Sequence, residues 1–358
     1  MPTKALKTSY DHELRLFPDI WNKIGLALFV LFALLYPFLV TTRWLTVGNL
    51  SFVFTVGSIG LMILTGFCGQ ISLGHAAFLA IGAYTAAILG EQIHLPFYLA
   101  IPAAGVAATA VGLLIGPFAL RLEGLYLAIV TIGLLFLTAH ILMSFPEYTH
   151  GATGIAVPMY IDFSSSSLFS DDTKIGALVL GFKEKLYYLY LLLTAFMTYI
   201  AFNIKRSSLG RAMMAVRDQD IAASVIGINL ARTKIISFGI SSFFAGVAGA
   251  MFAYQQQYIT IEPPFDFFMS VQYIAMIIVG GVGTLFGAIW GALFFAFIVP
   301  FADSFASIFP YLSELSSAQR STLLTAVIVS CFMIFEPLGL FGIWIRIKIY
   351  FMAWPFKY

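Results

Sequence analysis

The chain contains long intervals without any Asp, Glu, Lys or Arg, and this pattern limits what it can fold into more than any other feature. The intervals cover residues 24–42, 44–90, 92–120, 124–146, 186–204, 235–261, 267–302 and 321–335. A helix needs about 20 predominantly apolar residues to cross the hydrocarbon core of a bilayer. Intervals 44–90 and 267–302 are each long enough for two spans, and the others for one. The pattern therefore predicts an all-α integral membrane protein with about ten transmembrane helices.

The composition agrees with a membrane location. Hydrophobic residues make up 60% of the 358 positions and charged residues only 10%, whereas soluble domains carry about 25% charged residues. The net charge is +2, and the basic residues stand at loop ends rather than in long runs. We therefore expect membrane lipid around the chain and no nucleic-acid partner. We also expect one transmembrane domain over residues 1–358, with non-membrane segments at 1–23, 146–185 and 205–234.

The distribution of positive charge predicts an orientation. If the basic loop 205–234 is cytoplasmic and the spans alternate outward from it, both termini and the turn at Arg121 are also cytoplasmic. Segment 146–185 is then external. Of the 19 Lys and Arg residues, 14 lie inside under this arrangement. The five outside are Arg43, Lys174, Lys183, Lys185 and Arg320. This excess fits the positive-inside rule and predicts an even number of spans.

The sequence argues against an enzyme and against a transporter that is driven by ion coupling. Ion coupling usually needs an ionisable group within the membrane; His75 and His140 are the nearest candidates, and a lone His in a bundle is more often a packing residue. The chain contains no metalloprotease or serine-hydrolase motif and no G-x-x-x-x-G-K-[ST] phosphate loop. Its two cysteines are too few for a metal site. We expect no cofactor on this chain, and any ATP with Mg²⁺ on a partner.

A glycine-interrupted segment lies within the first long interval, over Thr65–Phe78. Backbone can depart from a helix at membrane depth only where protein or a water-filled cavity satisfies its polar groups. One interpretation is a broken helix that borders a translocation path, and the other is a tight cytoplasmic turn followed by a closely packed helix. Both interpretations stay open. The residues concerned are Gly66, Gly69, Gln70, Ser72, Gly74 and His75.

A second glycine-rich segment follows in the interval 267–302. Gly283, Gly287 and Gly291 recur every four residues, which is typical of close helix packing. The pairs Gly66/Gly69 and Gly280/Gly283 share one spacing, which hints at two related halves. The residues that we predict to border the path here are Gly280, Gly281, Gly283, Thr284 and Gly287.

The longest internal loop interleaves Ala, Met and Val with charged residues between Lys205 and Asn229. This pattern predicts short amphipathic helices at the membrane surface, with Gly227 as a helix C-cap. Arg217 and Asp218 are either solvated surface charges or part of a coupling element.

Four stretches together resemble the branched-chain amino acid ABC transporter permeases of the LivM type. They are Thr65–Phe78; Arg206–Gly249; Gly280–Thr284 with Gly287; and the ending Gly339–Lys348 with Tyr350, Phe351 and 354–356. The resemblance covers nearly everything from about Leu45 to the C-terminus. It implies an ABC importer permease fold in a bacterial inner membrane. The implied partners are a LivH-type permease, two cytoplasmic ATPase subunits and a periplasmic binding protein.

The resemblance also implies a substrate and a division of labour. The substrates would be Leu, Ile and Val, and specificity would rest mainly with the binding protein. Partner ATPases would move the internal loop and so open the path alternately to each side. A urea or short-chain amide permease has the same architecture and is the alternative. A stand-alone secondary transporter or channel is less favoured.

Two loops acquire roles through this resemblance. The internal loop contains Ala222-Ala223, then three further residues, then Gly227. This pattern looks like the EAA-type loop by which such permeases dock onto their ATPases, although Ile221 stands where that motif has an acidic residue. The residues assigned to coupling are Arg211, Arg217, Asp218, Asp220, Ala222, Ala223 and Gly227. The external stretch 151–154 resembles a glycine-rich loop of the family. Tyr148, Gly151 and Gly154 would then lie where a binding protein docks, and a plain surface loop is the other interpretation.

Overall fold

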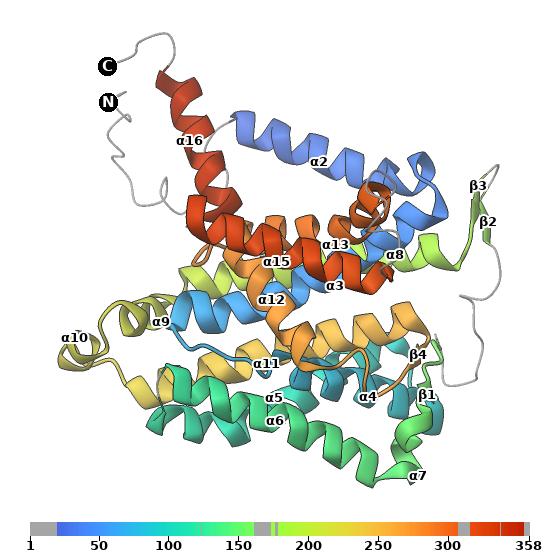
Figure 1. Ribbon diagram of the computed structural model, residues 1–358, viewed down its shortest axis with the longest axis horizontal. Coiled ribbons are helices and arrows are strands. Elements are labelled where there is room, and N and C mark those ends of the chain that lie inside the picture. Colours follow the sequence, from blue (N-terminus) through green and yellow to red (C-terminus); the bar gives the residue numbers. More distant parts are fainter. Residues whose placement is uncertain are drawn as a thin grey trace.

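The structure is a computed structural model, and it describes residues 20–122, 124–160, 173–175, 178–306, 316–336 and 338–353. Most of these residues are helical, and most of the long helices run roughly along one direction (Figure 1). The long helices are α2 (Ile20–Leu39), α3 (Thr42–Leu61), α4 (His75–Ile93), α5 (Phe97–Arg121), α6 (Leu125–Ser144), α8 (Phe182–Arg206), α11 (Leu230–Gln256), α12 (Phe267–Gly280), α13 (Leu285–Ala306), α15 (Ser317–Phe335) and α16 (Gly339–Ala353). Helices α12 and α16 are inclined to the common direction (Figure 1).

Short elements lie at the two ends of this bundle. One end carries α9 (Ser208–Asp218) and α10 (Asp220–Val225), and we call it the loop end. The opposite end carries β1 (Ile155–Ala156), which pairs antiparallel with β4 (Tyr258–Ile259), and we call it the strand end. The other short elements are a π-helical turn η1 (Met62–Phe67), α7 (Pro146–Thr149), a 3₁₀ turn η2 (Gly151–Thr153), and the antiparallel strands β2 (Thr173–Ile175) and β3 (Leu178–Leu180).

Six helices among the described residues are long and apolar enough to cross a membrane. Two further pairs are bent, α12 with α13 by 120° and α15 with α16 by 49°, so the number is eight if each pair is one span. The predicted count of about ten is therefore not confirmed. Interval 267–302 was expected to hold two spans, but α12 has 14 residues. At about 1.5 Å per residue, α12 is roughly 21 Å long, which is shorter than the ~30 Å hydrocarbon core.

The centre of the bundle is formed by α3 and α11. Of the residues in the apolar stretch formed by α3 and η1, 83% are buried, and the buried share in α11 is 78%. In α8, at the periphery, only 28% of the corresponding residues are buried. Glycines allow the helices around α11 to approach closely. A Cβ at Gly82 of α4 would overlap the backbone of Gly246 on α11, and one at Gly249 would overlap the carbonyl oxygen of Leu79. Small residues serve this purpose in membrane helices.

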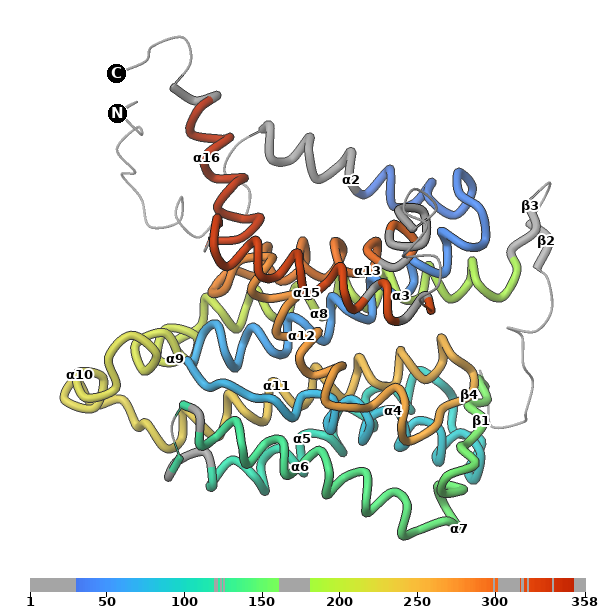
Figure 2. The backbone as a smooth tube through the Cα atoms, viewed as in Figure 1, coloured from blue at the N-terminus to red at the C-terminus, as the bar shows by residue number. Residues whose placement is uncertain are grey.

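Helices α4 and α12 both begin after non-helical runs. Residues 69–74 run back from the end of η1 as an extended segment, seen as the uncoiled blue stretch that leads to α4 (Figure 2). Residues 260–266, which form turns and bends, lead to α12. The two helix starts meet, because Ala76 N donates to Ser270 Oγ at 2.9 Å. The His75 and Tyr273 rings lie 5.1 Å apart.

Candidate functional site: the Arg217 junction and the strand-end pocket

Helix α3 ends at the loop end in a π-helical turn, η1. The last C=O groups of a helix lack intrahelical partners, as at any helix C-terminus. Gly69 adopts φ +73°, a left-handed conformation that favours glycine, and turns the chain into the extended segment. The carbonyl of Gly66 is thereby left near the surface helix α9.

Arg217 of α9 occupies this end of α3. Its Nη1 donates to the carbonyl oxygen of Gly66 at 2.7 Å, and hydrogen bonds from a charged donor are stronger than neutral ones. Asp218 holds the guanidinium from the other side, since its Oδ1 accepts from Nε at 2.9 Å and Nη2 at 2.7 Å. Gly69 packs directly on the side chain, because a Cβ there would lie 3.0 Å from Cγ of Arg217. A solvated surface charge does not account for these contacts.

The second glycine-rich segment reaches the same place. Gly283, at φ +88° in the turn between α12 and α13, lies so close that a Cβ would be 3.3 Å from Nη1 of Arg217. Its N–H also contacts Sδ of Met62 in η1 at 3.1 Å. The structure thus joins the three segments that the sequence singled out separately. We call this contact of Arg217, Asp218, Gly66, Gly69 and Gly283 the Arg217 junction.

The remaining glycines of the second segment pack α12 against α13 and α16. A Cβ at Gly280 would overlap the carbonyl oxygen of Gly287. Gly281 lies against the carbonyl oxygen of Leu338, which a Cβ would approach to 2.7 Å. Thr284 caps α13, since its Oγ1 accepts from Gly287 N at 3.0 Å.

Close helix packing, predicted from the four-residue spacing, is confirmed for Gly287 and Gly291. A Cβ at Gly287 would overlap the carbonyl oxygen of Gly281, and one at Gly291 would overlap that of Met276. Gly283, in contrast, lies in the turn before α13.

Polar residues of the first segment are buried within the protein. Gln70, Ser72 and His75 are at most 5% exposed. Gln70 Oε1 accepts from Ser237 Oγ at 3.3 Å, and His75 Nε2 lies 3.0 Å from the carbonyl oxygen of Gly57. Gly74 lies against the backbone of Thr131 on α6. The segment is extended rather than a tight turn, and a role in lining a path stays a prediction.

The internal loop forms two short helices, as predicted. Helix α9 buries Met213 and Val216 against the bundle. Helix α10 ends in a Schellman motif, with Ile228 N donating to Ala223 O and Gly227 N to Ser224 O, both at 3.0 Å. Gly227 has the left-handed φ of +89° that this motif needs, which confirms it as a C-cap.

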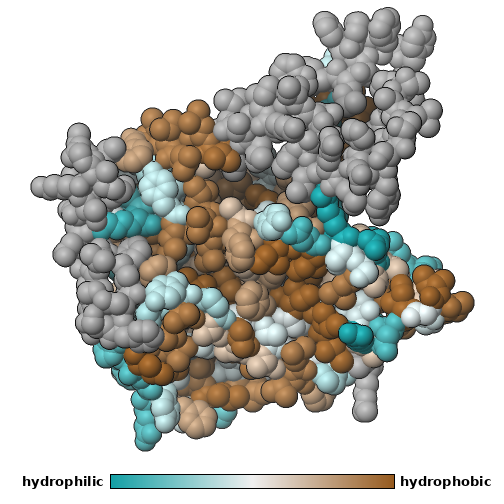
Figure 3. Space-filling model, turned by 180° about the vertical axis from the view of Figure 1, so that it is seen from behind, coloured by the Kyte–Doolittle hydropathy of each residue, from teal (hydrophilic) through white to brown (hydrophobic). Residues whose placement is uncertain are grey.

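The outer face of α10 carries an aliphatic patch that the sequence reasoning missed. Ile221, Val225 and Ile226 are 75%, 81% and 74% exposed, while Ala223 is buried and Ala222 exposed. The patch forms the brown tip at the right of the molecule in Figure 3. Its signal was an apolar i, i+4, i+5 spacing in a polar loop. The other residues assigned to coupling make local bonds: Arg211 donates to Arg206 O at 2.7 Å, and Asp220 Oδ1 accepts from Ile221 N at 2.8 Å.

The predicted docking loop lies at the strand end. Tyr148 is 48% exposed in α7. Gly151 and Gly154 are buried and adopt positive φ, and Gly154 is confined by the carbonyl oxygen of Ile259, which a Cβ would approach to 2.6 Å. The two glycines therefore have a conformational role beside β1, and a role of this loop in docking stays a prediction.

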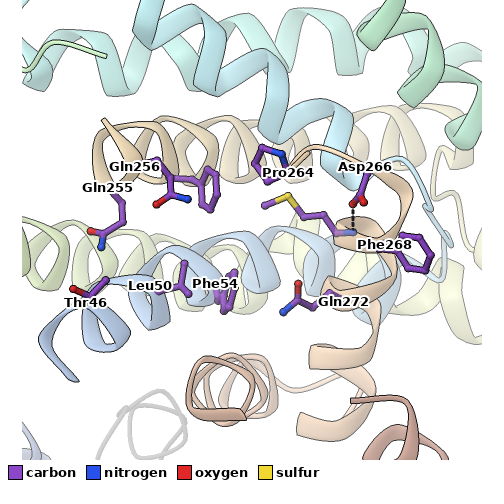
Figure 4. Close-up of a pocket in the computed structure, with 11 residues that line it drawn as sticks. Thr46, Leu50, Phe54, Gln255, Gln256, Pro264, Asp266, Phe268 and Gln272 are labelled. Atoms are coloured by element: carbon purple, nitrogen blue, oxygen red, sulfur yellow. Dashed lines mark hydrogen bonds between the residues drawn. The ribbon is translucent and has the colours of Figure 1, made fainter. Parts of the chain in front are cut away.

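A pocket opens between α3, α11 and the first turns of α12 towards the strand end. Its volume is about 260 Å³. Figure 4 shows Leu50 and Phe54 of α3 and Gln272 of α12 facing the space that Gln255 and Gln256 border from α11. Asp266, whose Oδ1 accepts from Met269 N at 2.9 Å, begins α12 at its edge. No local sequence pattern indicates this pocket, because its lining comes from three distant segments.

Comparison with known proteins places residues 41–335 in the family described as "Branched-chain amino acid transport system / permease component". The high-affinity branched-chain amino acid transport system permease protein LivM of Escherichia coli (strain K12) is 33% identical over 279 residues, which cover 75% of this chain and 65% of LivM. The chain thus spans about two thirds of that relative, 65% of its length.

Two other permease proteins of high-affinity branched-chain amino acid transport systems are similar to the chain. BraD of Pseudomonas aeruginosa (strain PAO1) is 25% identical over 310 residues, covering 83% of this chain and 93% of BraD. LivH of Salmonella typhimurium is 26% identical over 247 residues, covering 64% of this chain and 75% of LivH. No solved structure shows a significant match.

Proposed function

Because the chain belongs to the family of branched-chain amino acid transport permease components, we propose that it is a permease subunit of an ATP-driven importer of Leu, Ile and Val. It spans the bacterial inner membrane several times, with the loop end and both termini in the cytoplasm. The relatives named LivM and LivH support a second, LivH-type permease as its partner. Two ATPase subunits, which bind ATP and Mg²⁺, and a periplasmic binding protein complete the assembly.

The observation that carries this proposal is the Arg217 junction. An importer whose ATPase sits on separate chains needs a rigid connection from its cytoplasmic surface to its spans. Arg217 provides one, because it bonds to the end of α3 and touches the turn between α12 and α13. The aliphatic patch on α10 lies a few residues away and is exposed. Exposed apolar patches at such positions are typical of protein contacts.

The mechanism follows from these contacts. Helix α10 docks into the ATPase through Ile221, Val225 and Ile226. ATP binding and hydrolysis move α10 and, through their short connection, α9. The guanidinium of Arg217 then pulls or releases Gly66 and Gly283 together, so that α3 and the α12–α13 pair change position in one step. Opening alternates between the two faces of the membrane.

The decisive experiment is uptake of radiolabelled leucine by proteoliposomes that contain the chain with a LivH-type permease, both ATPases and the binding protein. We expect uptake only with ATP and with the complete assembly. Uptake without ATP or without partners would contradict an ABC importer. Uptake of urea in place of leucine would show that the substrate is urea or a short-chain amide and not an amino acid. It would not contradict the proposed coupling to ATP hydrolysis.

A further inference from the structure

The strand-end pocket has the size of a site for one small molecule. Its volume of about 260 Å³ lies just below the ~300–1,000 Å³ that is usual for pockets of drug-sized ligands. It is bordered by α3, by the last turn of α11 and by the first turns of α12. From the pocket, α3 continues to the Arg217 junction at the loop end.

One side of the pocket is apolar. Leu50 and Phe54 stand four residues apart on the same face of α3, and Phe252 of α11 and Met269 of α12 complete the surface. Phe54, Phe252 and Met269 are at most 7% exposed. An aliphatic side chain of a ligand would be stabilised there by burial of its surface, at roughly 25 cal/mol per Å².

The other side is polar and contains an acceptor without a partner. Among the described residues, Oε1 of Gln255 is buried and receives no hydrogen bond, and a buried acceptor in that state costs about 1–3 kcal/mol. An ammonium group of a ligand would satisfy it. The carboxylate of Asp266 adds negative charge at the same pocket, and its bond to Met269 N uses one of its two oxygens.

Donors for a ligand carboxylate stand on the same pocket. The side-chain amides of Gln256 and Gln272 line it, and each amide nitrogen carries two N–H donors. Lys183 places its ammonium beside Thr46 at the rim, with Nζ donating to Thr46 Oγ1 at 3.1 Å. Acceptors, donors and an apolar surface are thus combined within a space for one small molecule.

We propose that the strand-end pocket is a transit site that binds one zwitterionic aliphatic α-amino acid on its way through the permease. The proposal rests on the proposed function and adds to it a binding site on this chain. The apolar surface of α3 and α11 favours ligands with an aliphatic side chain, because that side chain is buried on binding. The amide groups favour ligands that carry both an ammonium and a carboxylate group, because they can hydrogen-bond to both. Most polar residues of the lining are neutral amides, which bind a charged ligand less tightly than a full set of opposite charges would, and this suits passage rather than storage.

The test uses substrate protection of a cysteine in the pocket. Gln272→Cys is introduced into a chain in which both native cysteines, Cys68 and Cys331, are replaced by Ser. The complete complex in nanodiscs is treated with a small membrane-impermeant methanethiosulfonate, with leucine, valine or urea added. Gln92→Cys is the matched control, because Gln92 is exposed near the strand end of α4 and outside the pocket.

We expect leucine and valine to slow labelling of Gln272→Cys saturably, about threefold when the ligand is at twice its dissociation constant. Labelling of Gln92→Cys should not change. Leu50→Trp, which fills the pocket, should raise the KM for leucine about tenfold or more while ATP hydrolysis persists. The same substitution at Leu192, which is 70% exposed on α8, should leave uptake unaltered.

The outcomes separate this proposal from the proposed function. If the cysteine-free complex takes up leucine but leucine does not protect Gln272→Cys, the pocket is not a transit site and the importer stands. Protection by urea instead of leucine overturns the ligand class. Failure of Gln272→Cys to react at all shows that another chain or a lipid fills the pocket, and this also overturns the transit site. Absence of leucine uptake by the unaltered complex contradicts both the function and the amino-acid ligand.

Discussion

The two ends of the central helices differ in how tightly they are packed. At the loop end, glycines bring the backbone of α3 and the α12–α13 turn against one arginine, and no Cβ fits at Gly66 or Gly280 without displacing atoms. At the strand end, α3, α11 and α12 diverge around a pocket of about 260 Å³ with an unpaired amide oxygen. The closely packed loop end can transmit a displacement, because packed interfaces move between discrete arrangements. The loosely packed strand end can admit a ligand.

The largest expected effect is a loss of stability when a single methyl group is added to a glycine at the closely packed loop end. Gly280→Ala places a Cβ on the carbonyl oxygen of Gly287, which is backbone and cannot rotate away. We expect a destabilisation of about 3 kcal/mol or more, measured as a loss of folded protein and a lower Tm in detergent. Gly133 of α6 has nothing within 4 Å of a Cβ, so Gly133→Ala should be neutral or slightly stabilising. Equal Tm values for the two variants would contradict the tight packing.

Arg217→Ala should separate ATP hydrolysis from uptake. The variant removes a charge-assisted bond to Gly66, of the kind that contributes about 1.5–3 kcal/mol, and leaves α10 free to dock. We expect leucine uptake to fall about tenfold or more, while ATP hydrolysis and assembly persist. Arg232→Ala is the matched control, because Arg232 is exposed at the start of α11 and lies outside the Arg217 junction. Parallel loss of hydrolysis and uptake in Arg217→Ala would identify a folding defect instead.

Much of the fold could be predicted because charge is excluded from the membrane interior. Intervals 44–90, 92–120 and 235–261 coincide with helices of the structure. The count of about ten is not confirmed at 267–302, because the absence of charge gives the length of an apolar segment and not its direction. The reversal at Gly281 and Gly283, both at positive φ, depends on packing that no interval reveals.

The candidate site was predicted in parts but not as an arrangement. Arg217, the loop and both glycine segments were identified from local patterns. The bond from Arg217 to Gly66 joins residues 151 positions apart, so it follows from tertiary packing alone. The pocket was missed for the same reason. The aliphatic patch was missed because the family motif consists of the small residues Ala222, Ala223 and Gly227, while the exposed residues beside them form the outer face.

A charge on the aliphatic patch should weaken ATPase docking. Val225 is 81% exposed, and burying such a side chain in a partner contributes about 1.5–3 kcal/mol. We expect Val225→Asp to lower the amount of ATPase that copurifies about tenfold, with the fold of this chain unchanged. Arg232→Ser changes an exposed residue at the start of α11, outside the patch, and should copurify normally. Undiminished copurification of ATPase with Val225→Asp would remove α10 from the interface.

The smallest effect concerns the turn that ends α10. Gly227 has φ +89°, and a Cβ at this position would meet no atom within 4 Å, so a side chain there would cost backbone strain and no collision. Left-handed backbone costs about 1–2 kcal/mol for an ordinary residue and less for Asn. We therefore expect Gly227→Ala to weaken ATPase affinity about fivefold and Gly227→Asn to weaken it less, as measured by titration of the ATPase. An equal loss for Ala and Asn would point to a direct contact at Gly227, because the strain that separates these two residues would then not decide the affinity.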